Sequence, residues 1–154
     1  MWIQLLGALL MLCCGAAWVG MKNREEREEL ARVAAFADLF GQVGGRIESL
    51  CLPLDEILSS LPPLLEACGM SEGTASSLRA AMARVRDREA ADTLARAADG
   101  LGRGTSGEQV RLCRAAAEEL ARCRDRMTAA ALNNARARWT LMLSAVLGVT
   151  ILFW

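Results

Sequence analysis

The sequence predicts an all-α protein, in which a cytoplasmic bundle of about six helices is flanked by an N-terminal and a C-terminal transmembrane helix. All 18 basic and all 18 acidic side chains of the 154 residues lie between Lys22 and Arg138, so both ends are uncharged. Apolar residues recur at helical spacing inside the charged part, and no segment shows the alternation of a half-buried strand. The predicted domains are a transmembrane helix at 1–21, a helical bundle at 22–138 and a transmembrane helix at 139–154.

The first uncharged stretch, 1–21, has enough residues to cross a bilayer core of about 30 Å as a helix. A signal peptide is the alternative, but here the basic residues follow the apolar stretch instead of preceding it, which favours a retained anchor. Small residues in this stretch would allow close helix packing, either within the chain or with another subunit. They are Gly7, Ala8, Gly15 and Ala16.

The second uncharged stretch, 139–154, covers only about 24 Å as a helix, so crossing requires a locally thinner bilayer or polar flanks at the interface. Trp139 and Trp154 stand at its two ends, as in an aromatic belt. Because the stretch has no charged face, a helix lying on the membrane surface is disfavoured.

Basic residues cluster on the inner side of each predicted span. They are Lys22, Arg24, Arg27 and Arg32 after the first span, and Arg124, Arg126, Arg136 and Arg138 before the second. The positive-inside rule therefore predicts a cytoplasmic head with both termini outside.

Two long helices are expected to frame the head. Residues 24–50 carry one apolar stripe at a period near 3.5, from Leu30 through Phe40 to Leu50. Its glycines (Gly41, Gly44 and Gly45) indicate either close helix packing or a break.

The last helix is predicted to begin at a capping box formed by Thr105 and Glu108. Its stripe runs from Val110 through Cys113, Leu120 and Cys123, and the helix continues into the second span with a bend expected at Asn133 and Asn134.

Short helices are predicted between these two. The first runs from Pro53 through Leu61, the second starts at Pro62 and is closed by Gly69, and the others cover 75–86 and 89–101.

Composition argues against an enzyme. The chain has no His and no Tyr, and the head is balanced in charge, so neither a His-based catalytic site nor a basic nucleic-acid footprint is expected. The six cysteines form no CxxC pair, and Cys113 and Cys123 lie on an apolar stripe, which predicts core residues rather than a metal or redox site. The glycine-rich loop before Thr105 lacks the GK[ST] ending of a nucleotide-binding loop. No catalytic residue, cofactor, metal, nucleic acid or small-molecule substrate is predicted.

A basic cluster offers the one candidate binding site of the head. Arg84, Arg86 and Arg88 lie at the junction of two short helices, beside Asp87 and Glu89. Such a cluster is either an ordinary solvated surface or a docking patch for an acidic partner or anionic headgroups.

Three blocks of sequence resemble the stage III sporulation protein AB family of endospore-forming bacteria. The first, RIESLCLPLDEIL, is similar to the family's pattern at Pro53, Leu54 and Glu56, with Ile47 and Glu48 in swapped order. The second, LARAADGLGRGTSGEQ, supplies the matching Leu101, Gly102 and Gln109. The third is the apolar end after a basic stretch, with Leu147 and Gly148 inside it. The resemblance covers nearly the whole chain, although no tryptophan stands between the short helices, where the family pattern has one.

The resemblance implies a function that composition and spacing do not. Members belong to the channel complex between mother cell and forespore, and they resemble the cytoplasmic domains of platform proteins in type II secretion and type IV pilus systems. It implies a non-enzymatic platform in the mother-cell membrane around the forespore. The implied partners are the stage III AA-type ATPase, other membrane subunits of the complex and the lipid bilayer. A platform subunit outside sporulation and a membrane-tethered helical scaffold without an ATPase remain alternatives.

Overall fold

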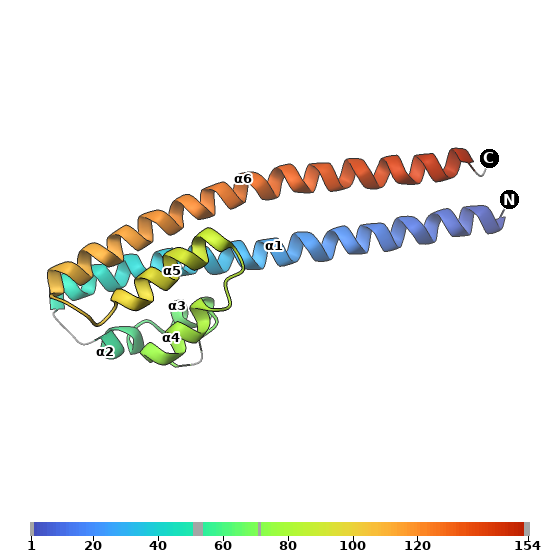
Figure 1. The fold of residues 1–154 in the computed structure, drawn as a ribbon. Helices are drawn as coiled ribbons and strands as arrows, with labels where there is room; N and C mark the ends of the chain where they lie inside the picture. The colour runs from blue at the N-terminus through green and yellow to red at the C-terminus, as the bar shows by residue number, and fades with distance from the viewer. Residues whose placement is uncertain (1, 51–53, 71, 153–154) are drawn as a thin grey trace. The chain divides into compact units, whose positions relative to one another are not determined.

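The computed structural model describes the backbone of residues 2–50, 54–70 and 72–152, and the side chains there except at 2–6, 8, 150 and 152. Every regular element in these ranges is an α-helix, which confirms the predicted all-α class. In chain order the helices are α1 (Trp2–Leu50), α2 (Leu54–Ser59), α3 (Pro62–Ala67), α4 (Ala75–Met82), α5 (Arg88–Gly100) and α6 (Ser106–Leu152) (Figure 1). They form two compact units, unit 1 (Met1–Glu28 with Met127–Trp154) and unit 2 (Glu29–Arg126).

Unit 2 is built around an apolar core to which all six helices contribute. The predicted stripes supply much of it, since Phe40 of α1 and Leu120 of α6 are buried. The buried face of α1 is wider than one stripe, because Phe36 and Leu39 are also enclosed. The short helices add Ile57, Leu58, Leu65, Leu78, Met82 and Leu94. Burial of these side chains is the main stabilising term of the unit.

Gly44 marks a close approach of α1 and α6, not a break. A Cβ atom built on Gly44 would lie 3.1 Å from the Cβ of Cys113, whereas Gly41 and Gly45 have no such neighbour within 4 Å. α1 is continuous through all three glycines. Of the two alternatives left by the sequence, close packing therefore holds at Gly44.

Helix ends follow the predicted capping chemistry at two places. At the start of α6 the amide of Thr105 donates to Glu108 Oε2 at 2.7 Å, and the amide of Glu108 donates to Thr105 Oγ1 at 3.4 Å. After α3, Gly69 adopts a φ of 75°. Its amide and that of Met70 donate back to the carbonyl oxygens of Glu66 and Leu65. This pattern is a Schellman motif, and the positive φ explains the glycine.

Two short helices end earlier than predicted. α2 stops at Ser59 instead of Leu61, and the hydroxyls of Ser59 and Ser60 bond back to carbonyl oxygens of the preceding turn. Serine side chains compete in this way with the backbone hydrogen bonds that would continue a helix. α4 stops at Met82 instead of Arg86, and the chain then turns into a connection to α5. Pro53, where the first short helix was expected to begin, lies outside the described residues.

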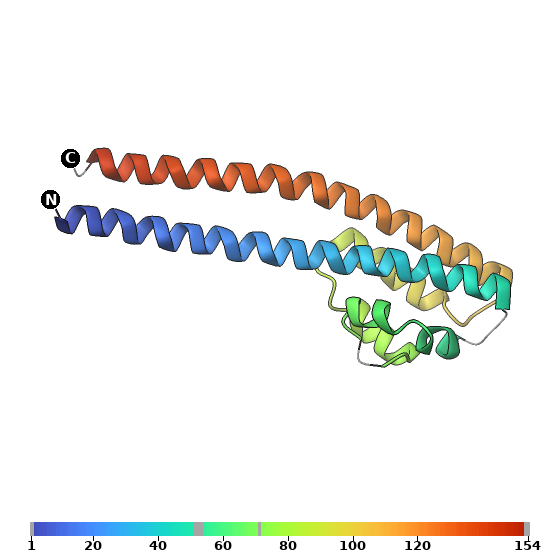
Figure 2. The same cartoon turned by 180° about the vertical axis from the view of Figure 1, so that it is seen from behind.

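Unit 1 consists of the first part of α1 and the last part of α6, which lie side by side in both views (Figures 1 and 2). Gly15 allows a close contact, because a Cβ built there would lie 3.2 Å from Met142 Cγ. The side chain of Ala8, another of the predicted packing residues, lies outside the described part. α6 continues as a helix through Asn133 and Asn134, where a bend was expected.

Within the described residues, no helix contains a stretch long and apolar enough to cross a membrane. The predicted spans 1–21 and 139–154 include residues outside that description, at 1–6, 8, 150 and 152–154.

Candidate functional site

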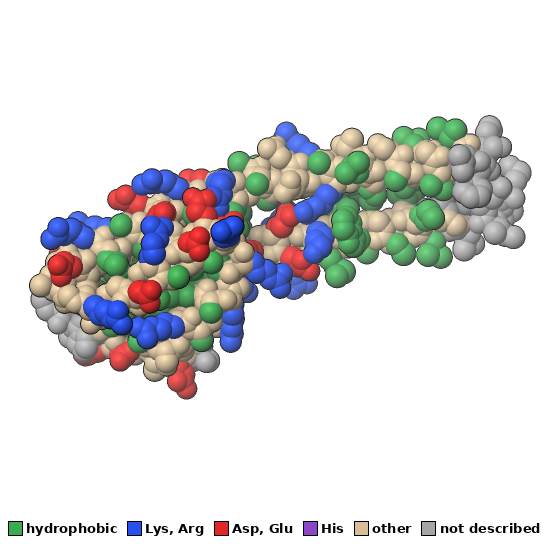
Figure 3. Space-filling view, in the orientation of Figure 1, with side chains coloured by type: hydrophobic (Ala, Val, Ile, Leu, Met, Phe, Trp, Pro, Cys, Tyr) green, Lys and Arg blue, Asp and Glu red, His purple; other side chains and the backbone are tan. Residues whose placement is uncertain are grey.

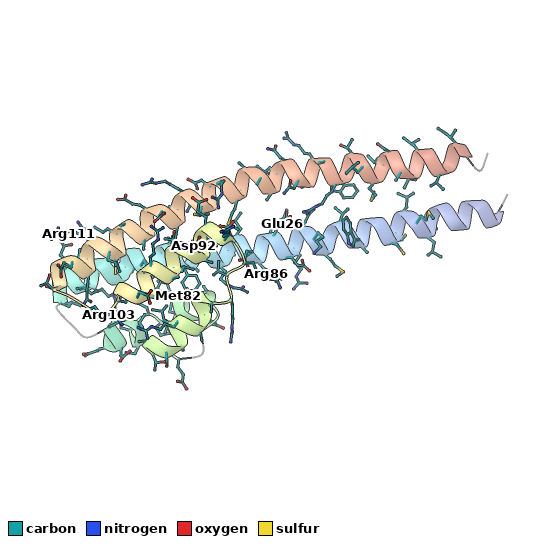
Figure 4. All side chains as sticks on the ribbon, in the orientation of Figure 1. Glu26, Met82, Arg86, Asp92, Arg103 and Arg111 are labelled. Atoms are coloured by element: carbon teal, nitrogen blue, oxygen red, sulfur yellow. The ribbon has the colours of Figure 1, made fainter. Side chains whose placement is uncertain are left out.

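The three predicted arginines lie on one exposed connection in unit 2. Arg84 and Arg86 belong to the link between α4 and α5, and Arg88 is the first residue of α5. All three side chains are exposed. Figure 4 labels Arg86 in this connection. Residues 84–88 are called the arginine segment below.

Glu29 of α1 holds the backbone of the arginine segment. Its Oε1 atom accepts hydrogen bonds from the amide of Arg86 at 2.5 Å and from the amide of Asp87 at 3.4 Å. The Glu29 side chain is only 14% exposed, so these bonds are largely shielded from water. Hydrogen bonds to a carboxylate are stronger than those between neutral groups, which fixes the segment against α1.

Arg126 of α6 engages the two carboxylates that neighbour the arginines in sequence. Its Nη2 atom donates to Asp87 Oδ1 at 2.9 Å, and its guanidinium also pairs with Glu89. Asp87 is at the same time the N-cap of α5 and accepts a hydrogen bond from the amide of Ala90 at 3.0 Å. Both acidic side chains of this region are therefore committed within the fold.

The guanidinium groups of the arginine segment remain unpaired as a result. Among the described residues, no carboxylate lies within ion-pair distance of Arg84, Arg86 or Arg88, although Asp87 and Glu89 adjoin them in sequence. Each guanidinium offers a planar fork of donors that fits a carboxylate or a phosphate group. This arrangement can bind an acidic surface.

The described family-motif residues lie on α2, in the connection between α5 and α6, and on α6. Leu54 of α2 and Leu101 after α5 line one small hollow together with Leu78 and Met82. Its volume of about 20 Å³ has room for roughly one water molecule, which is too small for a substrate. The remaining described motif residues are Glu56, which is exposed, Gly102, which has a φ of 81°, and Gln109, which is half-buried on α6.

The three described cysteines of unit 2 have the properties of core residues, whereas Cys51 lies outside the described residues. Cys68, Cys113 and Cys123 are buried. Burial raises the pKa of the Cys68 thiol to about 12, with a further contribution from the charge of Asp38, and burial raises the pKa of Cys113 to about 11. Both thiols are therefore protonated and unreactive near neutral pH. In the described part of the chain, no group of three or more Cys, Asp or Glu side chains is placed to hold a metal ion.

Alkylation tests this assignment. In the native full-length chain at pH 8, a maleimide is expected to leave Cys68 and Cys113 unmodified, since both the burial and the raised pKa oppose reaction. After denaturation the same residues should react fully, which serves as the control. Mass spectrometry of the peptides measures both states. Rapid modification of Cys68 in the native chain would contradict the described core.

Sequence reasoning did not identify Glu29 and Arg126 as parts of this site. Glu29 lies 57 residues from Arg86 in sequence, and Arg126 lies 39 residues from Asp87. Neither contact leaves a local pattern. The N-cap role of Asp87 could have been read from the sequence, because an Asp directly before a helix start is a preferred cap.

Comparisons of the chain with protein-family models, with curated proteins and with solved structures find no match in any of the three. The resemblance to the stage III sporulation protein AB family therefore rests on the sequence blocks alone and stays a prediction.

Proposed function

We propose that this protein is a non-enzymatic membrane platform subunit whose helical head docks a cytoplasmic ATPase through the arginine segment. The single observation that carries the docking role is the unpaired state of Arg84, Arg86 and Arg88, while Arg126 engages the neighbouring carboxylates. An exposed cluster of unpaired guanidiniums favours an acidic protein partner and steers its approach. The family resemblance supplies the identity of the complex, namely the channel between mother cell and forespore, with a stage III AA-type ATPase as partner.

The distribution of apolar side chains supports a membrane role for unit 1. Large hydrophobic side chains are exposed along it, and Leu50 is the one such residue of the described chain that belongs to unit 2. Figure 3 shows hydrophobic side chains gathered on the two helical segments of unit 1 and charged side chains covering unit 2. Exposed apolar surface of this kind marks an interaction with a membrane or another protein. We place unit 1 in the mother-cell membrane around the forespore, with the helical head in the cytoplasm and both termini outside.

Affinity capture from sporulating cells tests the proposal. The full-length chain, tagged and extracted in a mild detergent, is expected to retain a cytoplasmic ATPase at low salt and to lose much of it at moderate salt, because the contact is electrostatic. Immunoblotting against the stage III AA-type ATPase measures recovery, and an unrelated protein with two membrane spans is the control. Recovery of membrane subunits without any ATPase would instead favour a helical scaffold. Recovery of a pilus or secretion ATPase would favour a platform outside sporulation.

A further inference from the structure

Unit 1 carries a group of basic side chains next to its apolar part. The group is called the inner belt and consists of Lys22, Arg24, Arg27, Arg136 and Arg138. Arg138 Nη1 donates to Asn23 Oδ1 at 3.2 Å, so the basic residues of α1 and α6 lie at the same level of the helix pair. Trp18 and Trp139, which are 57% and 46% exposed, stand on the apolar side of this level.

The three acidic side chains of unit 1 are all engaged within the belt. Lys22 pairs with Glu25 at 2.8 Å, Arg24 pairs with Glu28 at 2.8 Å, and Arg138 pairs with Glu26. Among the described residues, Arg27 and Arg136 have no acidic partner. The belt therefore carries two surplus positive charges, one from each helix.

We infer that Arg27 and Arg136 bind the phosphate groups of anionic phospholipids, for which phosphatidylglycerol is the probe. The inference rests on the membrane placement of unit 1 in the proposed function, and it adds a lipid selectivity that the placement alone does not require. A guanidinium binds a phosphate oxygen pair through two parallel hydrogen bonds. A zwitterionic lipid offers the same phosphate, but its own ammonium group cancels the long-range attraction. The surplus charge therefore selects anionic headgroups.

The neighbouring tryptophans favour a lipid over an acidic protein at this belt. Trp rings concentrate at the headgroup level of a bilayer, because they combine an apolar body with a polar N–H group. Exposed Trp139 lies about one turn from Arg136 on α6, and exposed Trp18 lies about two and a half turns from Arg27 on α1, so both guanidiniums stand on the headgroup side of a tryptophan. Each basic side chain near an anionic surface contributes about 1 kcal/mol, which corresponds to about fivefold in local lipid enrichment.

The test uses the full-length chain reconstituted into vesicles of phosphatidylcholine with a minor fraction of phosphatidylglycerol. Brominated phosphatidylglycerol and brominated phosphatidylcholine are compared as quenchers of tryptophan fluorescence, which gives the relative association of the two lipids with the protein. The wild-type chain is expected to favour phosphatidylglycerol at least about fivefold. Arg27→Gln/Arg136→Gln should reduce this preference to nearly onefold.

A matched control removes two charges elsewhere. Arg103 and Arg111 have no ion pair among the described residues and lie around the start of α6 in unit 2 (Figure 4). Arg103→Gln/Arg111→Gln should leave the lipid preference unchanged. Absence of any preference in the wild-type chain, or an equal loss in both double variants, would overturn the inference while leaving membrane insertion intact. Failure of the chain to float with vesicles in a density gradient would overturn both the inference and the membrane part of the proposed function.

Discussion

Reversing the three charges of the arginine segment is expected to abolish most ATPase capture. In Arg84→Glu/Arg86→Glu/Arg88→Glu, an acidic partner would face three carboxylates in place of three guanidiniums, and juxtaposed like charges cost several kcal/mol. We expect recovery of the ATPase to fall on the order of 100-fold at low salt. Because these side chains are exposed and unpaired, the helical content of the chain should not change.

The control variant has the same net charge as the triple charge reversal of the arginine segment. Arg103→Glu/Arg111→Glu/Arg122→Glu reverses three other exposed arginines of unit 2. Within the described ranges only Arg122 of these has an ion pair, with Glu118 at 3.8 Å. Capture by this variant should stay within a few-fold of wild type, since its three charges lie outside the proposed contact and affect only the long-range approach of the partner. Equal loss in both variants would indicate a general charge effect. Full capture by the first variant would remove the docking role from the arginine segment.

Enlarging Gly44 is expected to separate α1 from α6 in unit 2. Any side chain on Gly44 projects toward the Cβ of Cys113 at 3.1 Å, with the carbonyl oxygen of Val110 at 3.8 Å. Gly44→Leu overpacks this contact and should lower the free energy of local unfolding by about 2 to 3 kcal/mol, despite the better helix propensity of leucine. Hydrogen exchange of the amides in 34–47 and 110–120 measures the change.

Gly45 provides the neighbouring control. It is exposed, and a Cβ built there meets no heavy atom within 4 Å. Gly45→Leu should therefore raise the local free energy of unfolding by up to about 1 kcal/mol, which is the propensity gain over glycine inside a helix. Faster exchange in Gly45→Leu than in Gly44→Leu would show that α1 and α6 do not pack as described.

The helices and their caps were predictable because they depend on residues that are close in sequence. The Thr105 and Glu108 capping box is readable three residues apart, and its hydrogen bonds lower the pKa of the Glu108 carboxyl in the structure. Gly69 after α3 is a similar local signal. The spacing of apolar residues on α1 and α6 likewise predicted much of the buried faces, although the buried face of α1 also includes Phe36 and Leu39, which lie outside the predicted stripe.

The position at which α4 ends and the ion pairs around the arginine segment were not predictable, because both involve residues that are distant in sequence. Nothing in residues 83–86 stops a helix, since this stretch has neither glycine nor proline. The helix instead ends at Met82, and Glu29 holds the connection that follows by accepting the amides of Arg86 and Asp87. In the same way, the sequence places Asp87 and Glu89 as partial counter-charges to the arginines, whereas the fold directs both toward Arg126.

In the proposed function, the chemistry of the arginine segment also restricts how docking is regulated. Arginine stays protonated at every physiological pH, and the chain contains no histidine and Lys22 as its single lysine. Neither a shift between about pH 6 and 8 nor lysine acetylation can therefore neutralise the arginine segment. In the proposed function, release of a docked ATPase would therefore originate in the ATPase, for example in a conformational change during its nucleotide cycle.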